Sequence, residues 1–164
     1  LDFVGIKPDP RVEGVSLRPY VEQPGADLSL ALFAETSYLF CKRYIPNEEP
    51  LYMEPMDSTT FVDESFDCHF VLKDKYQEDV LRTKERCLRT QNWKLVFTPG
   101  KNKDIWRLFD LHKDLHCEHP VNLEHPVIFT AMQNTLLKWM REKQESLVKD
   151  IFPDGEPSGE VVKK

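Results

Sequence analysis

The stretch RCLRTQNWKLVFTPGKNKDIWRLFDL, residues Arg86–Leu111, decides the fold. Its apolar and β-branched residues fall into three short runs that are typical of strands, namely Arg86–Thr90, Trp93–Pro99 and Ile105–Leu111. Gln91-Asn92 is a two-residue connection of the kind that closes a tight hairpin, and Pro99–Asp104 is a longer turn. We therefore predict three consecutive antiparallel strands in meander order.

Alternation along a strand assigns the side chains of this stretch to two faces. Trp93 shares a face with Leu95 and Phe97, whereas Lys94 and Val96 lie on the opposite face. The last run is largely apolar on both of its faces, so we expect both faces of the sheet to be covered. We predict that Trp93 packs under a C-terminal helix.

The segment after the meander supplies that helix. His125–Val148 carries apolar residues at three- to four-residue steps, which predict one apolar stripe, and Pro126 suits the first helical turn. Upstream, LSLALFAETS (Leu28–Ser37) suits a central strand. The sum is an α+β fold, in which a sheet of about four antiparallel strands carries a long C-terminal helix on one face.

The rest of the chain is predicted to extend and connect this unit. Residues 1–27 are rich in proline and form a wrapping segment, with at most one short helical turn near Ser16–Tyr20. Cys41–Asp57 is a long loop rich in proline and glutamate, and loops of that length are functional or mobile. Lys73–Glu85 is either a short helix or an extended connector. We assign residues 28–150 to the α+β subdomain and expect a frayed tail over residues 151–164.

Composition excludes some classes of function. The 164 residues suffice for one domain with a core. The net charge of −6 argues against nucleic-acid binding, which needs a basic face. No apolar run approaches the roughly 20 residues that span a bilayer. The four cysteines include no C-x-x-C pair, and both two disulfides and four thiols are compatible with the sequence, so the compartment stays undetermined.

Candidate site residues are few. His112, His116, Cys117 and His119 stand close together in DLHKDLHCEHP, where the H-x-x-x-H spacing would suit zinc on a helical face. A strand before this segment and a proline after it argue against a helix, so we favour a His-rich surface loop over a metal site. The sequence contains no nucleophile elbow, phosphate-binding loop or dinucleotide fingerprint. The residues alone indicate an α+β module without a self-contained active site.

Four segments nevertheless form a recognisable series over about Leu1–Met140: LDFVGIKPDPRVEGVSLRPYV, FAETSYLF, RTQNWKLVFTPG and IWRLFDLHKDLHCEHPVNLEHPVIFTAMQNTLLKWM. In this order they resemble the C-terminal part of the sulfatase family, within the alkaline-phosphatase-like superfamily. The third segment matches the family's R-T-x-x-W-K-L-(I/V), which makes Arg89, Thr90, Trp93 and Lys94 a motif that we interpret as structural. The turn Asp114–Leu123 departs from the family's D-P-x-E-x-x-N-L, since it lacks the proline and is two residues longer.

The resemblance implies hydrolysis of sulfate esters by an intact parent protein. In the family, a Cys or Ser in C/S-x-P-x-R becomes formylglycine, and a divalent cation, usually calcium, binds the sulfate oxygens. None of the cysteines begins that motif here, so no catalytic, cofactor-binding or metal-binding residue is carried over to this chain. We therefore expect a non-catalytic C-terminal subdomain that buttresses a catalytic domain preceding Leu1 and is inactive alone. Its loop Cys41–Asp57 is a candidate for shaping substrate access or contacts in a homo-oligomer.

Two alternatives stay open. The main alternative is the C-terminal part of a phosphonate or phosphodiester hydrolase of the same superfamily, because the motif that separates these enzymes lies outside the chain. The chain is also compatible with an independent binding module. An apolar patch would mark the docking surface of a catalytic domain, whereas a uniformly polar surface would favour the independent module.

Overall fold

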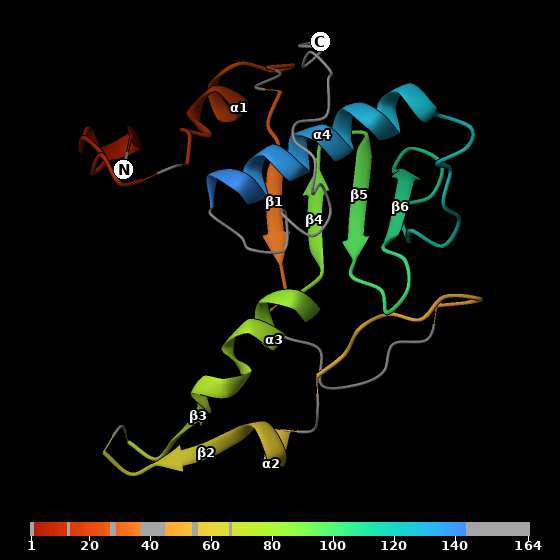
Figure 1. Ribbon diagram of the computed structural model, residues 1–164. Helices are drawn as coiled ribbons and strands as arrows, with labels where there is room; N and C mark the ends of the chain where they lie inside the picture. Colours follow the sequence, from red (N-terminus) through yellow and green to blue (C-terminus); the bar gives the residue numbers. More distant parts are fainter. Residues whose placement is uncertain are drawn as a thin grey trace. The chain divides into compact units, whose positions relative to one another are not determined.

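The computed structural model describes residues 2–12, 14–26, 29–36, 45–53, 56–65 and 67–143 of the chain (Figure 1). It divides into two units, Leu1–Leu30 and Ala31–Lys164. The predicted tail over residues 151–164 lies outside the described residues. The predicted boundaries at residues 27 and 150 stay predictions.

The first unit contains two short helical elements. The helix α1 (Arg18–Glu22) lies close to the predicted turn, with Pro19 in its first turn. A 3-10 helix, η1 (Asp2–Val4), is additional, so the expectation of at most one helical turn was wrong. The extra turn closes because the Gly5 N–H donates to the carbonyl of Asp2 at 3.1 Å, with Gly5 at a φ of +68° that glycine adopts without strain.

The second unit is built on a four-stranded antiparallel sheet in the order β1-β4-β5-β6. Its strands are β1 (Leu32–Glu35), β4 (Arg86–Arg89), β5 (Trp93–Thr98) and β6 (Ile105–Asp110). The last three pair consecutively, which confirms the predicted meander. The predicted α+β class and its four-stranded sheet are also confirmed.

The prediction of a central strand over Leu28–Ser37 was wrong in its position. β1 spans four residues, and in the described part of the chain it pairs only with β4. Since β5 occupies the other side of β4, β1 lies at the edge of the sheet. Only Phe33 of β1 is even half-buried, as an edge position allows.

The helix α4 (Pro126–Glu142) packs across one face of the sheet (Figure 1). It begins at Pro126, one residue after the predicted start at His125, and Pro126 lies in the first turn as predicted. Residues 144–148 of the predicted helix lie outside the described residues. Its apolar stripe and the sheet share one buried cluster, made of Leu88, Leu95, Phe97, Leu108, Met132, Leu136, Leu137 and Met140. Burying each such side chain contributes roughly 1.5–3 kcal/mol, so this cluster is the main source of stability. None of the described helices is long and apolar enough to cross a membrane.

A second, two-stranded sheet interrupts the connection between β1 and β4. It follows a short helix, α2 (Met56–Thr59), and consists of β2 (Thr60–Asp63) and β3 (His69–Leu72). These two strands were not predicted, and each spans only four residues. The segment left open at Lys73–Glu85 is helical, with the 3-10 helix η2 (Asp74–Tyr76) leading into α3 (Gln77–Thr83).

The described part of the predicted loop Cys41–Asp57 is held against the end of β5. The Leu51 N–H donates to the Pro99 carbonyl at 2.8 Å, and the Lys101 N–H donates to the Glu49 carbonyl at 2.9 Å. Ile45 and Met53 are buried. The loop is shorter than predicted, because α2 already begins at Met56.

The outer edge of β6 is closed by a side chain. Asn122 Oδ1 accepts from the Leu108 N–H at 2.7 Å, and Asn122 Nδ2 donates to the Trp106 carbonyl at 2.7 Å. The Val121 N–H adds a bond to the Leu108 carbonyl at 2.8 Å. The amide of Asn122 therefore takes the place of a neighbouring strand, since it satisfies one donor and one acceptor of β6.

Candidate functional site

The pairing register assigns the side chains of the large sheet to two faces. The helix face packs under α4. What we call the second face lies opposite and carries Leu32, Ala34, Cys87, Arg89, Lys94, Val96, Arg107 and Phe109. No described helix packs on the second face; the segment after β6 brings His116 and Cys117 beside it. The prediction that both faces are covered therefore holds only in part.

Thr90 and Trp93 of the motif organise the hairpin between β4 and β5. The Thr90 N–H donates to the Trp93 carbonyl at 2.9 Å, and the Trp93 N–H donates to Thr90 Oγ1 at 3.1 Å. Trp93 packs against the core cluster, as predicted, and meets the ring of His125 edge-on with centroids 4.9 Å apart. It is half-buried rather than fully buried, because it lies beside the start of α4.

Arg89 and Lys94 of the motif lie directly opposite each other on the second face. Because Thr90 and Trp93 form the closing hydrogen-bonded pair, the next pair along the ladder is of the non-hydrogen-bonded type, in which side chains approach most closely. Like charges directly opposite each other destabilise a sheet. Neither cation has a hydrogen bond or an ion pair with another described residue, which leaves this corner of the sheet positively charged.

A hollow of about 360 Å³ adjoins this corner. Val96 and Phe109 supply an apolar floor, Lys94 and Arg107 lie in its wall, and His116 and Cys117 border it from the segment after β6. Phe109 follows Lys94 across the sheet, so the aliphatic stem of the lysine runs beside an aromatic ring. The hollow thus combines an apolar base with cationic groups.

The two carboxylates beside the hollow are already paired. Glu85 accepts from Thr98 Oγ1 and from Arg107 at 3.3 Å, and Arg107 also donates to Thr98 at 3.1 Å. Glu85 and Thr98 are buried, so this network replaces the water that both groups lose on folding. Glu35 forms an ion pair with Lys84 at 2.8 Å. The positive charge of Arg107 is therefore offset locally, whereas those of Arg89 and Lys94 are not.

Cys87 lines the same hollow. Burial raises the pKa of its thiol above the ordinary value, and the positive charges of Lys94 and Arg89 act in the opposite direction. The field of both cations therefore reaches the base of the hollow. Cys68, Cys87 and Cys117 are free thiols, and Cys41 lies outside the described residues.

The four residues of the predicted His/Cys cluster do not gather around one point but have different neighbours. His112 Nε2 lies 2.8 Å from Asn92 Oδ1, whereas His119 lies beside Asp114. His116 and Cys117 border the hollow on the second face. Within the described ranges, no three His, Cys, Asp or Glu side chains gather closely enough to hold a metal ion.

Asp114 fixes the turn that departs from the family pattern. Its Oδ2 accepts from the backbone N–H groups of His119 and Glu118, both at 2.8 Å. These bonds, first that of His119, lower the pKa of Asp114 below its ordinary value, although burial acts in the opposite direction. These two bonds close a turn over residues 114–119 around the carboxylate.

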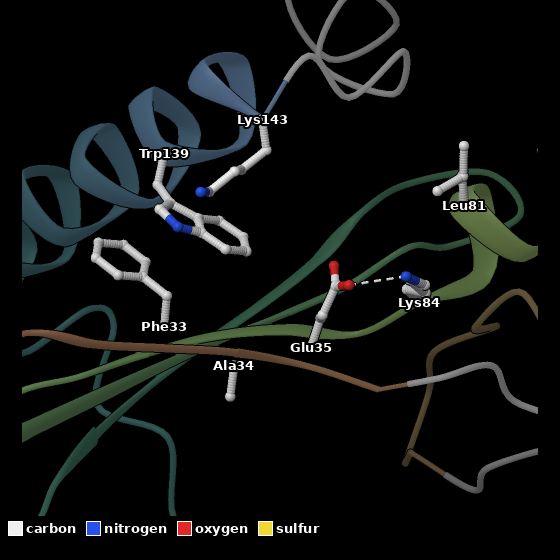
Figure 2. A pocket seen from close by; sticks show the side chains of 7 residues that line it. All are labelled: Phe33, Ala34, Glu35, Leu81, Lys84, Trp139 and Lys143. Carbon is white, nitrogen blue, oxygen red and sulfur yellow. Dashed lines mark hydrogen bonds and ion pairs between the residues drawn. The ribbon is translucent and has the colours of Figure 1, made fainter. Parts of the chain in front are cut away.

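A second hollow, also of about 360 Å³, lies on the helix face between β1, α3 and the end of α4 (Figure 2). Phe33 and Trp139 stack with centroids 5.1 Å apart and planes 8° from parallel. Figure 2 shows Lys143 directed toward the indole, whereas Ala34 points to the other side of β1. The aromatic pair fills this hollow in part and joins β1 to α4.

No protein-family model, no curated protein and no solved structure gives a significant match to the chain.

Proposed function

We propose that this chain is the non-catalytic C-terminal subdomain of a sulfatase-like hydrolase, whose catalytic domain precedes Leu1. The ordered series of four motif segments is the observation that carries the proposal. The α+β sheet with its C-terminal helix is the architecture that this series implies. The formylglycine nucleophile and the divalent cation, expected to be calcium, would belong to the catalytic domain, and so would the contacts to the sulfate ester.

The first unit supports the proposal independently of the motifs. No described residue of Leu1–Leu30 is buried. Its exposed apolar side chains are Phe3, Val4, Ile6, Val12, Val15, Leu17, Tyr20 and Val21. A segment with this much apolar surface and no core of its own is typical of one that packs against another protein surface. We propose that this surface belongs to the catalytic domain, which would make residues 1–27 a wrapping segment.

The decisive experiment compares the 164-residue chain with the protein encoded by the complete reading frame. We expect the residues upstream of Leu1 to contain C/S-x-P-x-R, and we expect only the longer protein to hydrolyse an aryl sulfate. Hydrolysis by the 164 residues alone would contradict the proposal, and so would an upstream sequence without that motif. Preference of the longer protein for a phosphonate or phosphodiester over a sulfate ester would instead support the related hydrolase class.

The loop Cys41–Asp57 has a proposed role of its own in the longer protein. Its described residues are held by Pro99 and Lys101 at one end of β5, so the loop has a fixed base. We propose that it shapes substrate access or contacts between copies of the protein. Replacing it with a short glycine-serine linker should change either the substrate profile or the assembly state measured by light scattering. If both stay the same, this role is wrong.

A further inference from the structure

The second face of the sheet carries two adjacent positive charges in a protein whose net charge is negative. The whole chain carries a net charge of −6, yet Arg89 and Lys94 stand side by side without an acidic partner among the described residues. A sheet tolerates such a pair at a cost, because like charges at directly opposite positions repel. An anion bound between them would remove that cost.

The hollow beside this pair has the volume of a small-molecule site, and its polar lining includes an apolar base. Ligand sites are typically concave, roughly 300–1,000 Å³ in volume, largely apolar and equipped with a few polar groups. Here the volume is about 360 Å³, Val96 and Phe109 form the base, and Lys94 lies in the wall. The carboxylates of Glu35 and Glu85 have partners already, so they do not neutralise Lys94.

We propose that this hollow is a binding site for a small organic anion. Lys94 and Arg89 would hold its sulfonate, sulfate, phosphate or carboxylate group, and Val96 and Phe109 would contact its apolar part. A guanidinium and an ammonium side by side offer the charge-assisted hydrogen bonds that such oxygens accept. The site is independent of the proposed hydrolase function, because that function assigns no ligand to these residues.

The test uses two probes that differ in charge and hardly in shape, naphthalene-2-sulfonate and the neutral naphthalene-2-sulfonamide. Isothermal titration of the 164-residue chain at low salt should give affinity for the sulfonate about tenfold or more above that for the sulfonamide, because hydrogen bonds to charged groups are the stronger kind. Added salt should weaken sulfonate binding. Amide chemical shifts in NMR should change around Val96 and Phe109.

Three variants locate the site. Lys94→Gln and Arg89→Gln should each reduce sulfonate affinity toward that of the sulfonamide, while Lys94→Arg should retain it. Lys138→Gln is the matched control, because Lys138 is an exposed lysine on α4, far along the chain from β5. Circular dichroism establishes that each variant is folded.

Several results would overturn the proposal. They are equal affinity for the two naphthalene probes, unchanged affinity in both glutamine variants, an equal loss in Lys138→Gln, or shift changes confined to residues outside the second face. Inorganic sulfate serves as a last probe. If it binds as tightly as the sulfonate, the apolar base has no part in recognition and the assignment to organic anions is wrong.

Discussion

At the scale of single residues, the motif Arg-Thr-x-x-Trp-Lys has side chains with two separate roles. Thr90 and Trp93 close the hairpin and attach it to α4 through the contact with His125. Arg89 and Lys94 point to the opposite face and contact neither α4 nor its core. Strand alternation accounts for this division, because neighbouring residues of a strand face opposite ways.

Trp93→Ala tests the structural half of the motif. Because Trp93 is half-buried, its loss should lower the free energy of unfolding by about 2–3 kcal/mol, below the range of about 3–5 kcal/mol that full burial gives. Urea unfolding followed by circular dichroism measures the change. Leu115→Ala is the control, since Leu115 is 68% exposed and should change stability by less than about 0.5 kcal/mol. A loss below about 1 kcal/mol for Trp93→Ala would show that the contact with α4 is unimportant.

The thiol of Cys87 provides a pH-dependent prediction. Burial raises its pKa, so the thiolate that reacts with iodoacetamide forms only at higher pH than for an ordinary cysteine. In native protein, mass spectrometry should find exposed Cys68 alkylated well before Cys87, with the rate at Cys87 rising at higher pH. Alkylation of both at the same rate would contradict this order.

The raised pKa of Cys87 also makes the stability of the fold depend on pH. The folded pKa of Cys87 lies above the unfolded value, so its contribution to stability is complete below the unfolded pKa and is lost as pH rises through the folded pKa.

Lys94→Gln removes a cation that lowers the pKa of Cys87, so the variant should shift the alkylation profile of Cys87 further toward high pH. An unshifted profile would show that Lys94 does not influence the thiol.

At the scale of elements, the side chain of Asn122 makes hydrogen bonds to the outer edge of β6 that a neighbouring strand would otherwise make. Asn122→Ala would leave the Leu108 N–H and the Trp106 carbonyl without their partner at the edge of β6. We expect a loss of about 1–3 kcal/mol in the free energy of unfolding and faster hydrogen exchange at Leu108. Asn102→Ala is the control, because the side chain of Asn102 makes only an exposed 3.4 Å bond to Glu49. Equal stability of the two variants would refute the role of Asn122.

The sequence was sufficient for the elements whose partners are close along the chain. β4, β5 and β6 could be predicted because each run is apolar and the turns between them are short, and α4 because its apolar residues recur at helical spacing. β1 was placed wrongly, since pairing between strands far apart in sequence depends on which edge is free. β2 and β3 were missed because four residues give too little alternation, although Thr60–Val62 and Phe70–Leu72 flank a polar turn typical of a hairpin.

The candidate site was predictable only in part. Lys94 and Val96 were assigned to one face from alternation alone, and the register adds Cys87, Arg107 and Phe109 to it. No pattern in the sequence indicates that the segment after β6 returns to this face with His116 and Cys117. Within that segment, the backbone N–H groups of Glu118 and His119 donate to the carboxylate of Asp114 and hold the turn around His116 and Cys117.

At the scale of the whole molecule, all residues of the core cluster come from the second unit. All members of the core cluster lie between Leu88 and Met140. The described residues before Ala31 are exposed or at most half-buried. The division agrees with the proposal of a subdomain that folds around its own sheet and is preceded by a wrapping segment. The proposed hydrolase function gives that segment its partner.

Removing residues 1–30 tests this division. The shortened chain keeps β1, the whole large sheet and α4, so it should unfold cooperatively, with a free energy of unfolding within about 1 kcal/mol of that of the full 164 residues. Thermal unfolding followed by circular dichroism at 222 nm, the helix band, measures it. Loss of the cooperative transition would show that the first unit is required for the core. In the protein encoded by the complete reading frame, the same deletion should impair hydrolysis.

Because the amide of Asn122 bonds the outer side of β6, the two edges of the large sheet differ in their ability to pair with another strand. With β6 closed on its outer side, another chain finds no free row of N–H and C=O groups there. In the described part of the molecule, β1 has a neighbour only on the side of β4. Strand exchange or edge-to-edge aggregation through the large sheet would therefore start at β1, and a charged or proline substitution at exposed Leu32 is the change that would suppress it.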